Sequence, residues 1–166
     1  MIKVPITSAM KRYATRNANR MGRIRNSITR GEGNVYGFLG EQIAQLVLGG
    51  EIVNKGKNYN VDYDLVLEDG VTVEVKTKKT KFEPKDYYEC SVADLNTKQK
   101  CDVYVFTRIL KDMTKGWILG YLNKEDYFKK ATFLKQGEID PSNNWKVSTD
   151  CYNLSINKLN TIEQLI

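Results

Sequence analysis

Histidine is the most informative absence in this chain, whose 166 residues contain none. Serine–histidine and cysteine–histidine catalysis, histidine general-base ribonucleases and histidine-metal nucleases are therefore excluded. The usual nitrogen ligands of zinc are missing as well. Any catalysis must use carboxylates, lysine, hydroxyls or a hard metal ion, and oxygen ligands of this kind suit Mg²⁺ or Mn²⁺ best.

Cysteines and long apolar runs are also scarce. Cys90, Cys101 and Cys151 are odd in number and form no C-x-x-C pair, which indicates reduced, buried thiols of a cytoplasmic protein rather than a disulfide framework. No run of 18 apolar residues occurs, so we expect no membrane span. The length fits a single domain with a substantial core.

Positive charge is concentrated at the start of the chain. Residues 1–30 carry eight Lys or Arg and no acid, whereas the rest carries 18 basic and 20 acidic residues. Helical spacing over Ser8–Ile28 predicts one stripe of four arginines, with Met10, Ala14, Met21 and Ile28 roughly opposite; the stripe consists of Arg12, Arg16, Arg20 and Arg23. We therefore expect a basic helical arm over residues 1–30 that contacts a phosphate backbone, followed by one domain over residues 31–166. A merely solvated or packing helix and an organellar presequence are the alternatives.

A predicted hairpin gathers charged side chains in the middle of the chain. Two short apolar runs, Val61–Leu67 and Val71–Val75, flank Glu68-Asp69-Gly70, which is typical of a three-residue hairpin loop. If Leu67 faces Val71, then Asp64 lies opposite Glu74 and Asp62 lies opposite Lys76. Because side chains alternate along strands, all four would share one face. Such a face suits Mg²⁺ together with a phosphate.

The remaining pattern predicts a sheet covered by helices. Helices are expected over Tyr36–Leu48, with Leu39, Ile43, Leu46 and Val47 facing inward, and, in short form, over Ala93–Gln99 and Lys124–Ala131. Asp102–Ile109 has the apolar, β-branched composition of a central strand, and Trp117–Leu122 is expected to pair with it. Further strands are expected over Glu51–Asn54, Tyr87–Val92 and Tyr152–Ile156. The fold class is therefore α/β or α+β.

Three segments together resemble the PD-(D/E)xK nuclease superfamily: Gly37-Phe38-Leu39-Gly40-Glu41, Asp62-Tyr63-Asp64-Leu65 and Glu74-Val75-Lys76-Thr77. That superfamily includes type II restriction enzymes, archaeal-type Holliday junction resolvases and many phage nucleases. The resemblance covers about residues 31–110 and implies a restriction-endonuclease-like αβββαβ core, with a mixed central sheet flanked by helices. The chain departs from the family pattern because no proline precedes the aspartate.

The resemblance also implies an activity and its residues. Glu41, Asp64 and Glu74 would be the ligands of Mg²⁺ or Mn²⁺, with Asp62 as the alternative acid, and Lys76 would orient or deprotonate the attacking water. The expected reaction is endonucleolytic cleavage of DNA to 5′-phosphate and 3′-hydroxyl ends, in the cytoplasm of a bacterial cell. Specificity for branched junctions and pairing of two subunits as a homodimer both stay open.

Other residues near this motif allow two interpretations. Lys78 and Lys79 continue the strand that carries Lys76, and they would either track the DNA backbone or form a solvated lysine edge. Gln99 and Lys100 precede the central strand, where a role in the site and a role on the surface are equally compatible with the pattern. At the level of the whole chain, the alternatives to a nuclease are a catalytically inactive nucleic-acid-binding protein of the same fold and a structural or interaction protein.

Overall fold

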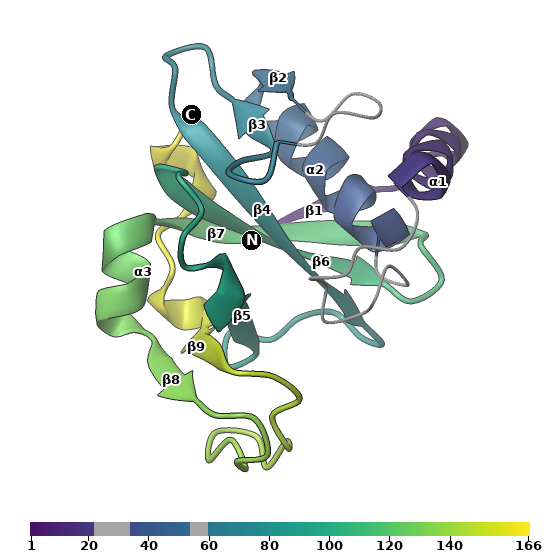
Figure 1. Ribbon diagram of the computed structural model, residues 1–166. Helices are drawn as coiled ribbons and strands as arrows, with labels where there is room; N and C mark the ends of the chain where they lie inside the picture. Colours follow the sequence, from purple (N-terminus) through teal and green to yellow (C-terminus); the bar gives the residue numbers. More distant parts are fainter. Residues whose placement is uncertain (22–33, 54–59) are drawn as a thin grey trace.

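A six-stranded mixed sheet forms the centre of the protein, with a three-stranded antiparallel sheet beside it (Figure 1). The computed structural model describes residues 1–21, 34–53 and 60–166. The strand order of the large sheet is β1-β7-β6-β4-β3-β2, and that of the small sheet is β5-β9-β8. In chain order the elements are β1 (Ile2–Pro5), α1 (Ser8–Met21), α2 (Asn34–Leu48), β2 (Glu51–Ile52), β3 (Leu65–Val66), β4 (Thr72–Thr80), β5 (Glu89–Ala93), the 3₁₀ turn η1 (Asp94–Asn96), β6 (Val103–Leu110), β7 (Lys115–Asn123), α3 (Lys124–Lys130), β8 (Thr132–Leu134), β9 (Cys151–Ser155), and the 3₁₀ turns η2 (Ile156–Lys158) and η3 (Ile162–Gln164).

The centre of the large sheet is the parallel pair of β4 and β6. Their register sets Glu74 beside Tyr104, and Lys78 beside Arg108. β6 is buried along most of its length, as its apolar, β-branched sequence predicts. The predicted pairing of the Trp117–Leu122 segment with this strand is confirmed, because β7 runs antiparallel to β6.

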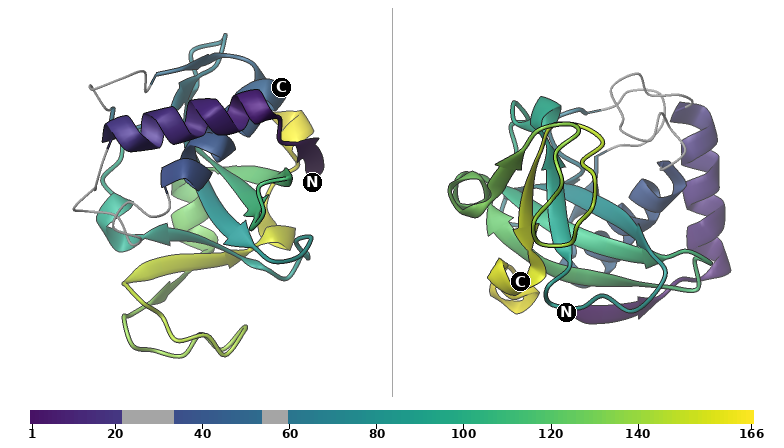
Figure 2. Two further views of the ribbon diagram at one scale, coloured as in Figure 1. Left: turned by 90° about the vertical axis from the view of Figure 1, so that its right-hand side faces the viewer. Right: turned by 90° about the horizontal axis from the view of Figure 1, so that it is seen from below.

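Two apolar cores lie on opposite faces of the large sheet. On one face, α2 buries Phe38, Leu39 and Ile43 against strand residues such as Val73 and Val105. On the other face, aromatic side chains of β6 and β7 pack against β5, β9 and α3; this second core includes Tyr104, Phe106, Trp117 and Tyr127. Figure 2 shows α1 at one side of the molecule and the small sheet at the other.

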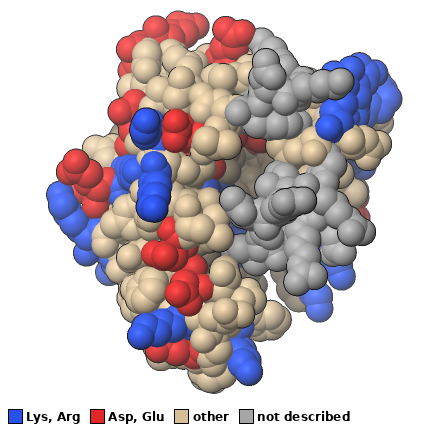
Figure 3. Space-filling model, viewed as in Figure 1, with Lys and Arg blue, Asp and Glu red and all other residues tan. Residues whose placement is uncertain are grey.

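The basic N-terminal segment is packed onto the body. β1 pairs with β7, and α1 lies along α2. Ala14 is fully buried, with Met10 and Met21 partly buried against the same core. The arginines point away from this contact: Arg12, Arg16 and Arg20 are exposed, and Figure 3 shows basic side chains gathered over α1. The predicted helix, with arginines on one side and apolar residues on the other, is confirmed over Ser8–Met21, whereas Arg23 and Ile28 lie outside the described residues.

Several sequence predictions need correction. The strand predicted over Val61–Leu67 is reduced to Leu65–Val66, and the helix predicted over Ala93–Gln99 is a single 3₁₀ turn. Leu46 was expected to face inward but is 67% exposed. Strands β1 and β8 were not predicted, because each is only three or four residues long and becomes a strand by pairing with a neighbour.

No helix in the described part of the chain is long and apolar enough to cross a membrane. All three cysteines are free and buried, as expected. Burial raises the pKa of the Cys90 thiol to about 12 and that of Cys101 to about 11. These thiols are therefore protonated at neutral pH, which fits a packing role.

Candidate active site

The β3–β4 hairpin positions the acidic residues. Its loop closes with a bond from the Leu67 N–H to the Val71 carbonyl at 2.9 Å, and Gly70 adopts a φ of 90°, a left-handed conformation that favours glycine. The register pairs Leu65 with Val73, as the sequence predicts. The hairpin therefore brings the chain before β3 alongside the first half of β4.

Asp64 lies beside β4 but not in the predicted pairing. Its N–H donates to the carbonyl of Val73 at 2.8 Å, and Val73 is already the partner of Leu65. The expected position of Asp64 directly opposite Glu74 is therefore wrong. Its carboxylate instead accepts the Val75 N–H through Oδ2 at 2.9 Å. This bond holds the Asp64 carboxylate against the strand that carries Glu74.

Asp62, the alternative acid, is directed elsewhere. Its Oδ1 accepts the Lys100 N–H at 3.1 Å, and its own N–H donates to Asn60 Oδ1 at 2.8 Å. The predicted strand pairing of Asp62 with Lys76 is wrong, because the ladder ends at Leu65. Asp62 therefore ties two loops together, and Asp64 is the aspartate held against β4.

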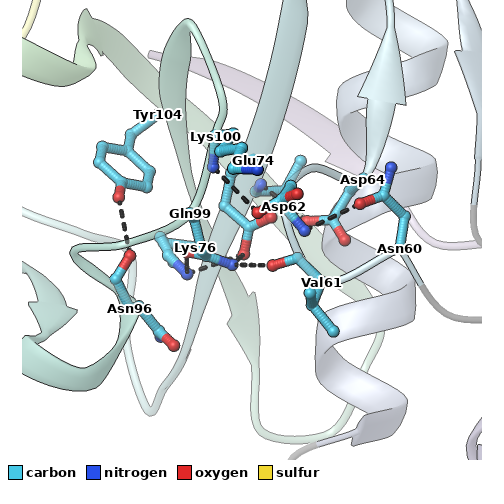
Figure 4. Close-up of polar contacts among 11 residues, drawn as sticks. Asn60, Val61, Asp62, Asp64, Glu74, Lys76, Asn96, Gln99, Lys100 and Tyr104 are labelled. Atoms are coloured by element: carbon cyan, nitrogen blue, oxygen red, sulfur yellow. Dashed lines mark hydrogen bonds and ion pairs between the residues drawn. The ribbon is translucent and has the colours of Figure 1, made fainter.

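Glu74 and Lys76 form an ion pair that Gln99 completes. Lys76 Nζ donates to Glu74 Oε1 at 2.7 Å and to Gln99 Oε1 at 2.9 Å. Gln99 Nε2 donates in turn to Glu74 Oε1 at 2.8 Å and to the Val61 carbonyl at 2.9 Å. Figure 4 shows Lys76 and Gln99 converging on the Glu74 carboxylate, with Asp62 and Asp64 on the adjoining chain. Both charged side chains are mostly buried, at 11% exposure for Glu74 and 14% for Lys76, so the pair is only weakly screened.

Glu41 reaches the same region from α2. It is 8% exposed, and its Oε2 has no hydrogen-bond partner among the described residues. Burial raises the pKa of the Glu41 carboxyl well above its usual value, and the negative charges of Asp64 and Glu74 raise it further. Three carboxyl groups from α2, the hairpin and β4 therefore interact electrostatically.

Gly40 explains how α2 comes close enough to the sheet for this interaction. A Cβ at this position would lie 2.0 Å from Thr77 Oγ1 and 2.6 Å from Thr107 Oγ1. Those two hydroxyls form a hydrogen bond with each other at 2.8 Å across β4 and β6. Only a residue without a side chain fits there, and the next residue is Glu41.

These residues fit a hard divalent cation. The unpartnered, buried Glu41 oxygen and the repulsion that raises its pKa are both features that a cation would relieve. Among the described residues, however, no three His, Cys, Asp or Glu side chains stand as a ready-made metal cluster. Lys76 and Gln99 engage Glu74, and the Val75 amide engages Asp64. Glu41, Asp64 and Glu74 would hold a cation after Glu74 exchanged part of these contacts for it.

The two lysines expected to follow the DNA backbone lie on different faces of β4. Lys79 is exposed, and its Nζ lies over the Tyr36 ring at 5.1 Å from the centroid. Lys78 turns inward and donates to Ser91 Oγ at 2.6 Å and to the Glu89 carbonyl at 3.2 Å. The alternative of a solvated lysine edge is wrong for Lys78, because its side chain is not exposed and bonds to Ser91 and to the Glu89 carbonyl.

Gln99 is the residue whose role the sequence left undecided. The structure places it in the site, bonded to Glu74, Lys76 and the chain that leads to Asp64. Its position just before the central strand β6 was the only available signal. That signal does not say which way a side chain in a loop will turn.

Comparison of the sequence with protein-family models and with curated proteins finds no match.

Proposed function

We propose that the protein is a Mg²⁺-dependent DNA endonuclease of the PD-(D/E)xK type. The observation that carries the proposal is the buried, unpartnered oxygen of Glu41, beside the charges of Asp64 and Glu74 and close to a strand that also presents Lys76. Buried carboxylates that repel one another are costly unless a cation joins them. A lysine two residues from one of them supplies the positive group that phosphate chemistry needs.

The order of elements supports the restriction-endonuclease-like core. α2 is followed by β2, β3 and β4 as an antiparallel series, and then by β6 parallel to β4. This agrees with an αβββαβ core in which the second helix is reduced to η1 and β5 is inserted before it. Glu41 lies on α2, Glu74 and Lys76 lie on β4, and Asp64 lies in the chain just before β3, which supports the roles that the resemblance implies for them.

Each side chain has a distinct task in the proposed reaction. Glu41, Asp64 and Glu74 would hold Mg²⁺, which when bound polarises the scissile phosphate and lowers the pKa of a coordinated water. Lys76 would donate to the attacking water or to a phosphate oxygen, since its ammonium has donors beyond those used by Glu74 and Gln99. Gln99 keeps the Lys76 and Glu74 headgroups in register by bonding to both.

The exposed arginines of α1 supply the second half of the proposal. Arg12, Arg16 and Arg20, here called the arginine stripe, lie on one side of a helix whose other side is anchored to α2. Fixed cations on a rigid element suit a phosphate backbone, because each neutralised phosphate releases counterions. The stripe would hold DNA while the carboxylate site cuts it.

The direct test is incubation with plasmid, linear duplex, single-stranded and four-way-junction DNA, each with Mg²⁺ and with EDTA. We expect cleavage of at least one substrate with Mg²⁺ and none with EDTA. The Lys76→Ala variant should bind DNA and fail to cut it, whereas Lys130→Ala, which removes an exposed lysine at the end of α3, should cut at the parental rate. Cleavage by Lys76→Ala at the parental rate would contradict the mechanism.

A catalytically inactive nucleic-acid-binding protein is the second candidate, and one observation favours it. The Glu74–Lys76 ion pair is complete without a metal, and the described residues contain no preformed three-acid cluster. In that case the arginine stripe would still bind DNA. Calorimetry with Mn²⁺ or Ca²⁺ separates the two candidates, because only the nuclease requires a cation to bind at Glu41.

A further inference from the structure

A cavity beside the proposed catalytic lysine has four positive side chains in its lining. It has a volume of about 290 Å³ and runs along β4, bounded by β5 and β6 and reaching Tyr36 of α2. Four cations line it, Lys76, Lys78, Lys79 and Arg108, against one acid, Glu89. A volume near the lower end of the range for small-molecule sites, roughly 300–1,000 Å³, can admit a phosphate with its attached sugar.

Lys78 and Arg108 are the unusual pair in this lining. They are register partners on the adjacent parallel strands β4 and β6, so their side chains leave the sheet together on one face. Like charges placed directly across neighbouring strands are destabilising. Burial lowers the pKa of both groups, and Arg108 lowers that of Lys78 further. Retaining two such cations side by side calls for an explanation.

The partners of these cations are mostly neutral. Arg108 Nη2 donates to the Glu89 carbonyl at 2.8 Å, and Lys78 donates to that carbonyl and to Ser91 Oγ. Arg108 Nε is buried and has no hydrogen-bond partner among the described residues. Among the described residues, neither Lys78 nor Arg108 forms an ion pair with a carboxylate within 4.0 Å. Glu89 is the one acid in the cavity lining, and burial raises the pKa of its carboxyl group.

The position of the cavity relative to Lys76 suggests what the anion is. Lys76 and Lys78 are two residues apart on the same face of one strand, which separates their Cα atoms by roughly 6.6 Å. Successive phosphates of one nucleic-acid strand have a comparable separation. We propose that Lys78 and Arg108 bind a phosphate of the substrate strand next to the linkage that is cleaved beside Lys76. That the phosphate belongs to the cleaved strand rests on the proposed nuclease function. The affinity of the cavity for phosphate does not depend on that function.

The first test uses inorganic phosphate, so it is independent of cleavage. Calorimetric titration of the metal-free protein should detect binding, and Lys78→Met should weaken it at least about tenfold, the effect of losing one charge-assisted hydrogen bond. Lys130→Met, at an exposed position on α3, should leave it unchanged. A purely structural role, in which the two cations only fasten β5 to the sheet, predicts a lower melting temperature for Lys78→Met with parental phosphate affinity.

A second measurement covers the case in which Lys78→Met does not fold. In the unaltered protein, phosphate should shift the NMR signal of the Arg108 Nε–H, which gains a partner. An unshifted signal, or parental phosphate affinity in a folded Lys78→Met variant, would overturn the proposal.

DNA then distinguishes a terminal from an internal phosphate. Affinities are compared for 5′-phosphorylated and 5′-hydroxyl duplexes with the parent and with Lys78→Met. A parental preference for the phosphorylated end that disappears in the variant assigns the cavity to a terminal phosphate, whereas equal weakening on both duplexes assigns it to an internal one. Undiminished affinity of the variant for both would overturn the proposal. If Lys78→Met loses phosphate binding but the parent cleaves no DNA, the proposed phosphate site stands and the proposed nuclease function is wrong.

Discussion

Replacing Glu41 by glutamine removes a buried charge and keeps the shape of the side chain. The folded protein raises the pKa of this carboxyl, mainly through burial and then through Asp64 and Glu74. Folding therefore favours the protonated form, so the contribution of Glu41 to stability is fully present below the ordinary glutamate pKa of about 4.5 and is lost as pH rises through the folded-state value. Glu41→Gln has no charge to lose and should escape this decline.

The expected magnitude follows from the unpartnered Oε2. A buried polar atom without a partner costs about 1–3 kcal/mol, and more when charged. The glutamine amide must itself be accommodated, so we expect a net gain near the lower end, about 1 kcal/mol. For a chain of this length that corresponds to an increase of about 2–4 °C in melting temperature.

Differential scanning calorimetry in EDTA, at pH values from about 4 to about 8, measures this effect. Glu41→Gln should melt above the parent at neutral pH, and the difference should vanish as pH falls to the ordinary glutamate pKa. The matched control is Glu163→Gln, which removes an exposed glutamate and should melt with the parent throughout. Mg²⁺ should reverse the order: at 100 times its dissociation constant it stabilises the parent by about 2.7 kcal/mol, and the variant much less. A Glu41→Gln variant that melts below the parent in EDTA at neutral pH would show that the buried Glu41 charge does not destabilise the fold. A difference in melting temperature that does not depend on pH would show the same.

Three further substitutions test how the site is assembled. Gly40→Ala forces a methyl group against Thr77 and should destabilise the fold by about 1–3 kcal/mol in urea unfolding. The control is Gly37→Ala, which should not destabilise the fold because nothing lies within 4 Å of its new methyl group. Equal effects of the two substitutions would show that α2 does not approach the sheet as described. Gln99→Ala removes the group that bonds to both members of the Glu74–Lys76 pair, so kcat should fall about 10–100-fold with DNA affinity retained. A parental kcat would show that Gln99 does not position this pair for catalysis. Replacing all three residues of the arginine stripe by glutamine should weaken DNA binding and reduce the slope of log affinity against log salt by about three; an unchanged slope would mean that DNA binds elsewhere.

The sequence predicted those parts of the fold that depend on local pattern. The apolar composition of Asp102–Ile109 identified the central strand, observed as Val103–Leu110, and Glu68-Asp69-Gly70 gave the correct register for Leu65 and Val73. Alternation along β4 placed Glu74 and Lys76 on one face, because residues two apart in a strand always share one.

The errors occurred where the chain departs from regular alternation. Strand periodicity was extended back to Val61, but the ladder ends at Leu65, so side-chain bonds to the Val75 and Lys100 amides place Asp64 and Asp62 instead. The choice for Lys78 between following the DNA backbone and forming a solvated edge stayed open, because the sequence does not show that β5 will cover that face of the sheet. The bonds of Gln99 depend on three separate loops and strands meeting, which no local pattern encodes.

The measurement closest to the central claim is a crystal structure of the protein soaked in Mn²⁺, analysed by anomalous scattering. We expect one strong anomalous peak bound by oxygens of Glu41, Asp64 and Glu74, with Lys76 released from its contact with Glu74 Oε1. No peak near Glu41, with the Glu74–Lys76 ion pair intact at saturating Mn²⁺, would contradict it.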